Sequence, residues 1–163
     1  MNAATPHDPG LDVDNRLAAV WRDSRLGPTV ERLRQHVLRN GELTMEVAHY
    51  RLLHAMVDLG PSPMRELAMA VGASQSSVSR TVQRLESQGF VERTQNEVDL
   101  RSVLVSVTDE GRKVHDYLVD RAFDTYQEIF AVFTIHERDL LADLMERLLK
   151  SADATLNPGS EGR

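Results

Sequence analysis

Apolar residues recur every three or four positions through most of this chain, which is the spacing of amphipathic helices. The helical period begins at Asn15 and resumes beyond Gly27-Pro28, so the first part is either one kinked helix or two abutting helices. Thr44 can cap the next helix, whose apolar face continues to Val57. The glycine and proline residues of 60–63 end that helix.

Two short helices joined by a tight turn are predicted next. Ser62 as the N-cap and Pro63 at the first helical position open a helix that ends at Gly72. Ser74 is a good N-cap for the second helix, which runs to about Gln88. This order of elements is typical of a helix-turn-helix.

A β-hairpin and two long helices complete the pattern. Residues 90–93 read as a short strand, and the alternating valines of 103–107 form a second strand that pairs with it across a polar loop. One long helix starts at 108–110, and a final helix runs from about 136 to 154. The predicted fold is therefore mainly α with a small β-hairpin (α+β), a winged helix-turn-helix flanked by long dimerisation helices.

The chain divides into a central lobe, flanking helices and two tails. Residues 61–107 hold the winged helix-turn-helix, and residues 1–14 and 155–163, which are poor in large apolar residues, are expected to be flexible tails. The helices of 15–60 and 108–154 carry more apolar surface than one small wing can cover, so we expect them to form a dimer interface. The side chains expected in that interface are Trp21, Leu33, Val37, Tyr126, Phe130, Phe133, Leu141, Leu144 and Leu148.

The second helix of the helix-turn-helix is the candidate DNA-reading element. In this geometry it lies in the major groove with its N-terminal residues at base edges. With Val78, Val82 and Leu85 facing inward, the opposite face offers glutamine, serine and arginine, which suit bases and phosphates. The residues predicted to contact DNA from these two helices are Arg65, Ser74, Gln75, Ser76, Ser77, Ser79, Arg80, Gln83 and Arg84. A merely polar helix face is the alternative, and the attached hairpin disfavours it.

Several motifs occur here together: the segments 65–68, 72–80 and 85–93, the pair Asp99-x-Arg101, and the run Val107-Thr108-x-x-Gly111. In this combination the chain resembles the MarR family of bacterial transcription regulators, over roughly residues 16–152. The resemblance implies a homodimeric, sequence-specific repressor on a pseudo-palindromic operator of double-stranded DNA, with one recognition helix in each half-site.

The resemblance also assigns a role to the loop of the hairpin. Arg101 would enter the minor groove, where a narrow A·T-rich stretch attracts arginine, and Asp99 would help to position it. An exposed ion pair that stiffens the loop is the alternative. The chain departs from the family pattern because residues 94–98 offer no arginine or lysine and position 100 is leucine. Fewer neutralised phosphates predict weaker nonspecific binding and a shallower salt dependence.

A small-molecule effector site is a further expectation from the resemblance. MarR-like proteins often bind a small, frequently aromatic anion in the crevice between the dimer helices and the DNA lobe. The candidate lining residues are Trp21, His36, Tyr50, Arg51, His54 and Met56, with Arg51 as the partner of the anion. At helical spacing the same residues could instead belong to the core.

Charge distribution changes the first impression from composition. A net charge of −6 disfavours a nucleic-acid partner, but residues 1–15 and 109–163 together carry −8. Residues 74–93 hold three arginines against two acids. We therefore expect DNA binding that is selective, weakly nonspecific and salt-sensitive.

Other chemistries find little support in the sequence. The chain has no cysteine, and His49 and His54 are five positions apart rather than the three or four that place two ligands on one helix face. The ladder of Asp116, Asp120 and Asp124, with His115 alongside, is typical of a solvated face. No metal site is therefore expected. Without a phosphate-binding loop or nucleophile elbow, we expect neither an enzyme nor a cofactor.

Neither a membrane-spanning run nor a secretion signal is apparent, which favours a cytoplasmic protein. The alternative function is a winged helix that serves as a dimerisation or protein-interaction module without DNA.

Overall fold

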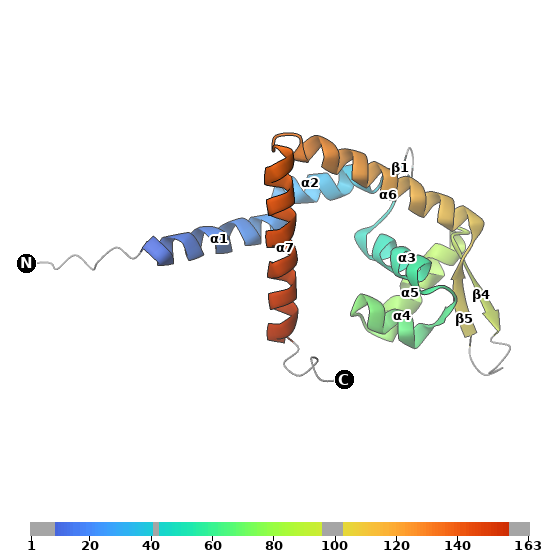
Figure 1. The fold of residues 1–163 in the computed structure, drawn as a ribbon. Helices are drawn as coiled ribbons and strands as arrows, with labels where there is room; N and C mark the ends of the chain where they lie inside the picture. The colour runs from blue at the N-terminus through green and yellow to red at the C-terminus, as the bar shows by residue number, and fades with distance from the viewer. Residues whose placement is uncertain (1–8, 41–42, 96–102, 157–163) are drawn as a thin grey trace, which may run out of the picture. The chain divides into compact units, whose positions relative to one another are not determined.

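A computed structural model of the chain describes residues 9–40, 43–95 and 103–156. The chain divides into two units, Met1–Asp120 and Arg121–Arg163, and each is described by itself. The first unit contains the winged helix-turn-helix, and the second contains the end of one long helix and the whole of the last one (Figure 1). The predicted fold class, mainly helical with a small antiparallel sheet, is confirmed.

Three short helices and a three-stranded sheet form the lobe. The helices are α3 (Val47–Leu59), α4 (Met64–Val71) and α5 (Gln75–Ser87). The strands β3 (Ser62–Pro63), β4 (Val91–Gln95) and β5 (Val103–Val107) lie in the antiparallel order β3-β5-β4. Figure 1 shows the β4–β5 hairpin directly after α5, in the position of a wing.

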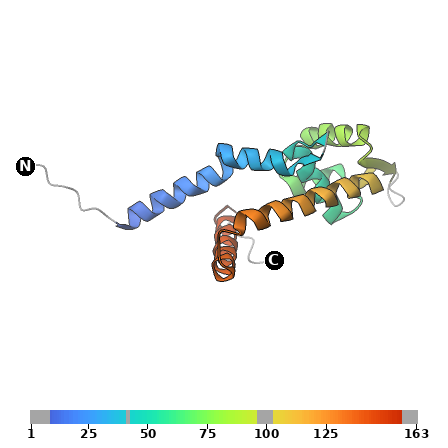
Figure 2. The same ribbon diagram turned by 90° about the horizontal axis from the view of Figure 1, so that it is seen from above.

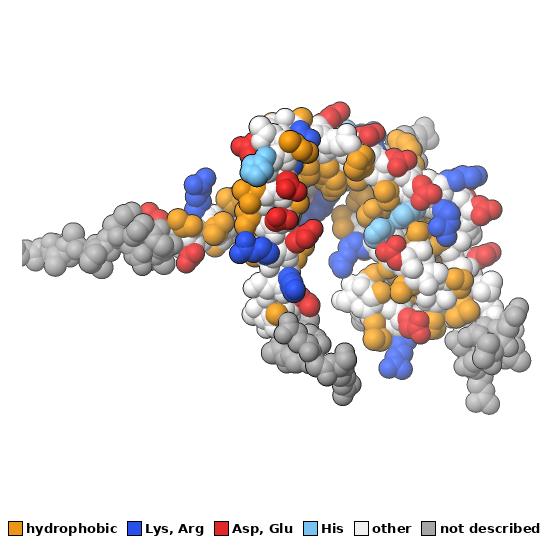
Figure 3. All heavy atoms as spheres, viewed as in Figure 1, with side chains coloured by type: hydrophobic (Ala, Val, Ile, Leu, Met, Phe, Trp, Pro, Cys, Tyr) orange, Lys and Arg blue, Asp and Glu red, His pale blue; other side chains and the backbone are white. Residues whose placement is uncertain are grey.

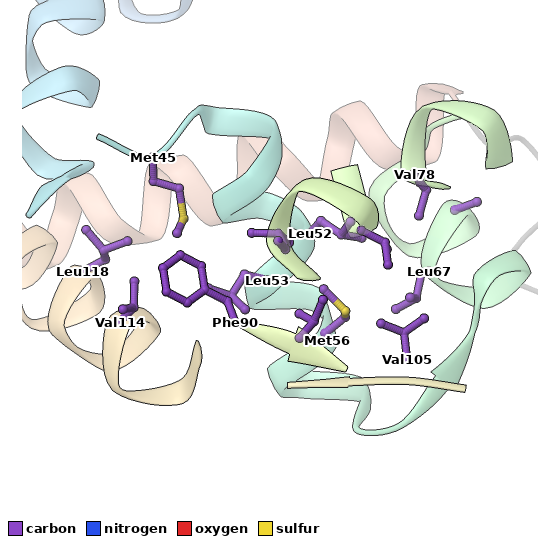
Figure 4. Packing of buried hydrophobic residues seen from close by; sticks show 14 residues of the cluster. Met45, Leu52, Leu53, Met56, Leu67, Val78, Phe90, Val105, Val114 and Leu118 are labelled. Carbon is purple, nitrogen blue, oxygen red and sulfur yellow. The ribbon is translucent and has the colours of Figure 1, made fainter. Parts of the chain in front are cut away.

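The core of the lobe is built from the inward faces of these helices and of the sheet (Figure 4). Leu53, Leu67, Val82, Leu85 and Val105 are completely buried. Each buried aliphatic side chain stabilises the fold by roughly 1.5–3 kcal/mol relative to an exposed one. Tight packing around the inward face of α5 therefore fixes which of its faces points outward.

Helix α6 (Asp109–Phe130) belongs to both units, since its first half packs on the core of the lobe and its second half lies beyond Asp120. Val114 and Leu118 are the α6 residues in the core, and Figure 4 shows them beside the ring of Phe90. The last helix, α7 (Ile135–Leu156), contains no buried residue.

The N-terminal segment consists of two helices, α1 (Pro9–Leu26) and α2 (Pro28–Val37), which settles the choice between a kink and a break (Figure 2). Pro28 is at the first position of α2, where its missing N–H costs no hydrogen bond. A minimal hairpin of β1 (Arg39–Asn40) and β2 (Leu43–Thr44) leads to α3. None of the described helices is long and apolar enough to cross a membrane.

Several local expectations were wrong. Helix α1 begins at Pro9, ahead of Asn15, and α7 continues to Leu156. Thr44 lies in β2 and does not cap α3, whose N-cap residue is Glu46.

Ser62 does not cap α4 either, because it lies in β3 and its hydroxyl donates to the carbonyl of Gly60. Pro63 takes the N-cap position of α4 instead. The β3–β5 pairing joins residues about forty positions apart, so local patterns did not indicate it.

Candidate nucleic-acid interface

The turn between α4 and α5 sets the direction of the candidate recognition helix. Gly72 ends α4 with φ 62° and ψ 39°, a left-handed conformation that glycine adopts without strain. Ser74 then has extended backbone, and its hydroxyl accepts a hydrogen bond from the N–H of Ser77 at 3.3 Å. The predicted N-cap of α5 is therefore confirmed, and it satisfies a backbone donor of the first turn.

The outward face of α5 carries the chemistry that the sequence predicts for it. Val78, Val82 and Leu85 are buried, so the opposite face is presented to solvent. The exposed residues on α5 include Gln75, Ser76, Ser79, Arg80, Gln83 and Arg84. No ion pair with another described residue involves Arg80 or Arg84, so both guanidinium groups keep their positive charge uncompensated by such pairing.

Two of the predicted serines have local roles. Ser77 is half-buried and lines a small cavity between α3 and α5 with Thr81, whose hydroxyl donates to the carbonyl of Ser77. Ser74 is exposed, and its hydroxyl lies 3.1 Å from that of Ser76 as well as accepting from the Ser77 N–H. Ser77 thus lies at the edge of the exposed face that carries Arg80, and Arg65 on α4 is exposed.

The base of the wing is tied to the end of α5. Arg93 on β4 lies 3.4 Å from the carboxylate of Glu86, and both side chains are partly exposed. Glu86 therefore compensates Arg93, one of the three arginines in residues 74–93. The other two, Arg80 and Arg84, are the cations of α5. Asp99 and Arg101 lie outside the described residues.

The predicted effector residues come together only in part. A hollow of about 360 Å³ between α3 and α4 is lined by Tyr50, Arg51, His54, Ala55, Asp58, Leu59, Ala70 and Val71. Arg51 donates from Nη2 to the carbonyl oxygen of Val71 at 3.1 Å, which ties α3 to the last residue of α4. Met56 is in the core of the lobe, 1% exposed.

The other two candidates, Trp21 and His36, lie on α1 and α2 and do not line this hollow. The guanidinium carbon of Arg25 lies 5.6 Å from the centre of the Trp21 ring, within range of a cation–π contact. Tyr50, Arg51 and His54 are therefore the only predicted effector residues that line the hollow between α3 and α4.

Sequence reasoning missed a polar contact between α3 and α6. His115 is 6% exposed and lies 2.9 Å from His54, measured between Nε2 and Nδ1. Asp116 is exposed as expected, but its carboxylate contacts Nδ1 of the buried His115 at 2.9 Å. His54 and His115 are 61 positions apart, so spacing along the chain could not reveal the pair. No cluster of three or more potential metal ligands occurs within the described ranges.

These elements define the chain as a winged helix-turn-helix protein whose helix α5 exposes Arg80 and Arg84, neither of them in an ion pair with another described residue. The model of the MarR family matches residues 45–103, which include α3, the helix-turn-helix and the first strand of the wing. Over this segment the chain matches the MarR family of transcriptional regulators.

Relatives and solved structures agree with this assignment. The HTH-type transcriptional regulator BilQ of Clostridium symbiosum is 29% identical over 118 residues, 71% of this chain and 82% of BilQ. Apo MarR from E. coli is 24% identical with a TM-score of 0.66, over 83% of this chain and 96% of that one. PcaV from Streptomyces coelicolor is 28% identical with a TM-score of 0.58, over 78% and 97% of the two chains.

Proposed function

We propose that this protein is a homodimeric regulator that binds double-stranded DNA in a sequence-specific manner through α5 and represses transcription. The observation that carries the proposal is the two-sided character of α5. Its inner face is completely packed, and its outer face presents Gln75, Arg80, Gln83 and Arg84 to solvent. Glutamine pairs with adenine, and arginine pairs with guanine or phosphate. This activity places the protein in the cytoplasm, where operator DNA lies.

The apolar surface of the long helices supports a second copy as the partner. Residues beyond Asp120 expose Phe123, Tyr126, Ile129, Phe130, Phe133, Leu140, Leu144 and Leu148, among others. Trp21 is also exposed, Leu33 and Leu141 are half-buried, and Val37 is already buried within one chain. Figure 3 shows apolar side chains reaching the surface beside charged ones. An exposed set of this size is typical of an interface, and a two-fold dimer covers it by self-association.

A footprint on the DNA that flanks the gene of this protein tests the proposal. We expect two protected half-sites about one helical turn apart, one for each recognition helix. Failure of the wild-type protein to retain this DNA at low salt would favour the alternative, a winged helix used only for protein contacts.

Release by a small aromatic anion is the second part of the proposal. Tyr50, Arg51 and His54 line one hollow, with an aromatic ring, a guanidinium and an imidazole on its wall. BpsR of Bordetella bronchiseptica, whose DNA binding is regulated by 6-hydroxynicotinic acid, has a similar fold, with 22% identity and a TM-score of 0.63 over 82% of this chain and 98% of that one.

Thermal melting with a panel of phenolic acids tests this second part. We expect the melting temperature to rise for a ligand that binds the folded protein and to stay unchanged in Arg51→Met. A panel without any effect on the wild-type protein would argue against the hollow as an effector site.

A further inference from the structure

A chain of polar side chains links α3 to α6 within the lobe unit. His54 Nδ1 lies 2.9 Å from His115 Nε2, and His115 Nδ1 lies 2.9 Å from an oxygen of Asp116. At the other end, His54 Nε2 lies 3.8 Å from an oxygen of Asp58. The two imidazole planes differ by 17°, and their centres are 5.2 Å apart. These values describe rings that meet edge to edge, so the contact between them is a straight, in-plane N–H···N hydrogen bond.

The positions of the protons follow from this geometry. A carboxylate only accepts hydrogen bonds, so Nδ1 of His115 carries a proton toward Asp116. In neutral His115 the other nitrogen, Nε2, is then an acceptor, and the N–H of His54 Nδ1 donates to it. His54 Nε2 is the remaining nitrogen of the pair, and the His54 side chain is half exposed to solvent.

The hydrogen bond between the two rings is therefore compatible with one added proton but not with two. A proton on His54 Nε2 makes a cation that faces Asp58 and turns the bond to His115 into a charge-assisted one. A second proton would have to sit on His115 Nε2, where it would meet the N–H of His54 across 2.9 Å.

Two carboxylates and one guanidinium are the charged groups around the pair. Asp58 on α3 and Asp116 on α6 contact the two ends of the pair. Arg51 lines the same hollow as His54 and opposes the added charge, while its Nη2 donates to the Val71 carbonyl. Helix α4 contributes only Ala70 and Val71 to the hollow, and the ring of Tyr50 lies 5.8 Å from that of His54 between ring centres.

We propose that His54 and His115 form a single-proton lock that holds α3 to α6 more firmly as the pH falls from 8 to 6. Protonation of His54 strengthens the link between α3, in the winged helix-turn-helix lobe, and α6, which leads out of that lobe. A more firmly held α6 lowers the cost of ordering the protein on its operator, so acidification increases operator affinity. This last step rests on the proposed DNA-binding function.

The lock itself is tested without DNA, by imidazole ¹⁵N NMR of the histidine-labelled full chain. Signals are assigned from His54→Gln and His115→Gln. Between pH 8 and pH 6 we expect His54 to gain a proton at Nε2, while His115 keeps one proton, on Nδ1. Proton uptake by His115 while His54 stays neutral, or full protonation of both rings, would overturn the proposal.

Thermal melting and operator binding complete the test, with His136→Gln as the matched control, because His136 is an exposed histidine on α7. From pH 8 to 6, the melting temperature of the wild type and control should rise by about 2–4 °C relative to His54→Gln. Their operator affinity should increase about fivefold more than that of His54→Gln. Equal pH responses in all three proteins would refute the lock. If no variant binds DNA but the NMR and melting results hold, the proposed function fails and the lock stands.

Discussion

At the scale of single residues, the two cations of α5 are the sharpest test of DNA reading. Arg80 and Arg84 are one helical turn apart on the exposed face of α5. Replacing either by alanine should weaken operator binding by about 1–3 kcal/mol if the side chain contacts a base, with relaxed specificity at that base pair. For a phosphate contact, the salt slope should instead fall by about one unit.

Titration of labelled operator at several salt concentrations separates these two outcomes. Arg112→Ala is the control, because Arg112 is an exposed arginine on α6 rather than on α5. Arg80→Ala and Arg84→Ala proteins that bind as tightly as the Arg112→Ala protein would contradict a role of α5 in binding.

Gly111 is the residue on which the junction of α6 with the wing depends. A Cβ at this position would overlap the carbonyl oxygen of Phe90. The same junction is held by Thr108, whose N–H donates to Phe90 O and whose hydroxyl donates to Gly89 O. The Thr-x-x-Gly pattern noted in the sequence thus has a physical cause, namely the close approach of two backbones.

Gly111→Ala should therefore destabilise the fold by roughly 1–3 kcal/mol, the usual cost of inserting a methyl group into a packed site. Urea denaturation followed by circular dichroism measures the change in the free energy of unfolding. Arg112→Ala, which truncates the exposed neighbour, should be nearly neutral, and a Gly111→Ala protein as stable as this control would disprove the steric argument.

At the scale of elements, the start of α7 is fixed by a capping box. The N–H and the hydroxyl of Thr134 both contact a carboxylate oxygen of Glu137 at 2.8 Å, and the N–H of Glu137 lies 3.3 Å from the Thr134 hydroxyl. The backbone and side-chain hydrogen bonds from Thr134 lower the pKa of Glu137 below its usual value.

A lowered pKa in the folded state means that this contact stabilises α7 above the ordinary pKa of a glutamate. The contribution is lost as the pH falls through the lowered value. Glu137→Gln should therefore flatten the acid side of the pH–melting curve, whereas Glu146→Gln, an exposed glutamate later in α7, should not. Superimposable acid limbs for wild type and Glu137→Gln would rule out this role.

Elements defined by local patterns were predictable, and elements defined by distant partners were not. The N-cap of α5 depends on Ser74 and the N–H three residues on, so the sequence was sufficient to place it. β3 exists because Ser62 and Pro63 pair with Val105 and Leu104, which no local periodicity indicates. The outward face of α5 followed from helical spacing, whereas the His54–His115 contact required the fold to bring α3 and α6 together.

At the scale of the whole molecule, charge and apolar surface are divided between regions. The acidity is concentrated in residues 1–15 and 109–163, while α5 carries Arg80 and Arg84. Under the proposed function, such a division keeps nonspecific attraction to DNA low without removing the cations proposed to contact the bases. In the proposed dimer, the exposed apolar residues of α6 and α7 have a separate task, which is to join the two winged helix-turn-helix lobes.

Replacing Leu144 by aspartate tests that task, because Leu144 is an exposed apolar residue of α7, where no residue is buried in one chain. In a dimer the substitution places two carboxylates in an apolar interface, which should raise the dimer dissociation constant at least about 100-fold. Sedimentation equilibrium measures this constant, and Asp143→Asn, the exposed neighbour, is the control.

The same variant tests whether the two winged helix-turn-helix lobes of a dimer bind the operator together or independently. A Leu144→Asp monomer keeps the lobe and α5 intact, since the packed core lies in α3–α6 and the sheet. It should still fold, yet lose tight operator binding, because each lobe then holds its half-site alone. A Leu144→Asp protein that remains dimeric, or a monomer that protects both half-sites at wild-type concentrations, would show that dimerisation through the long helices is not what positions the recognition helices.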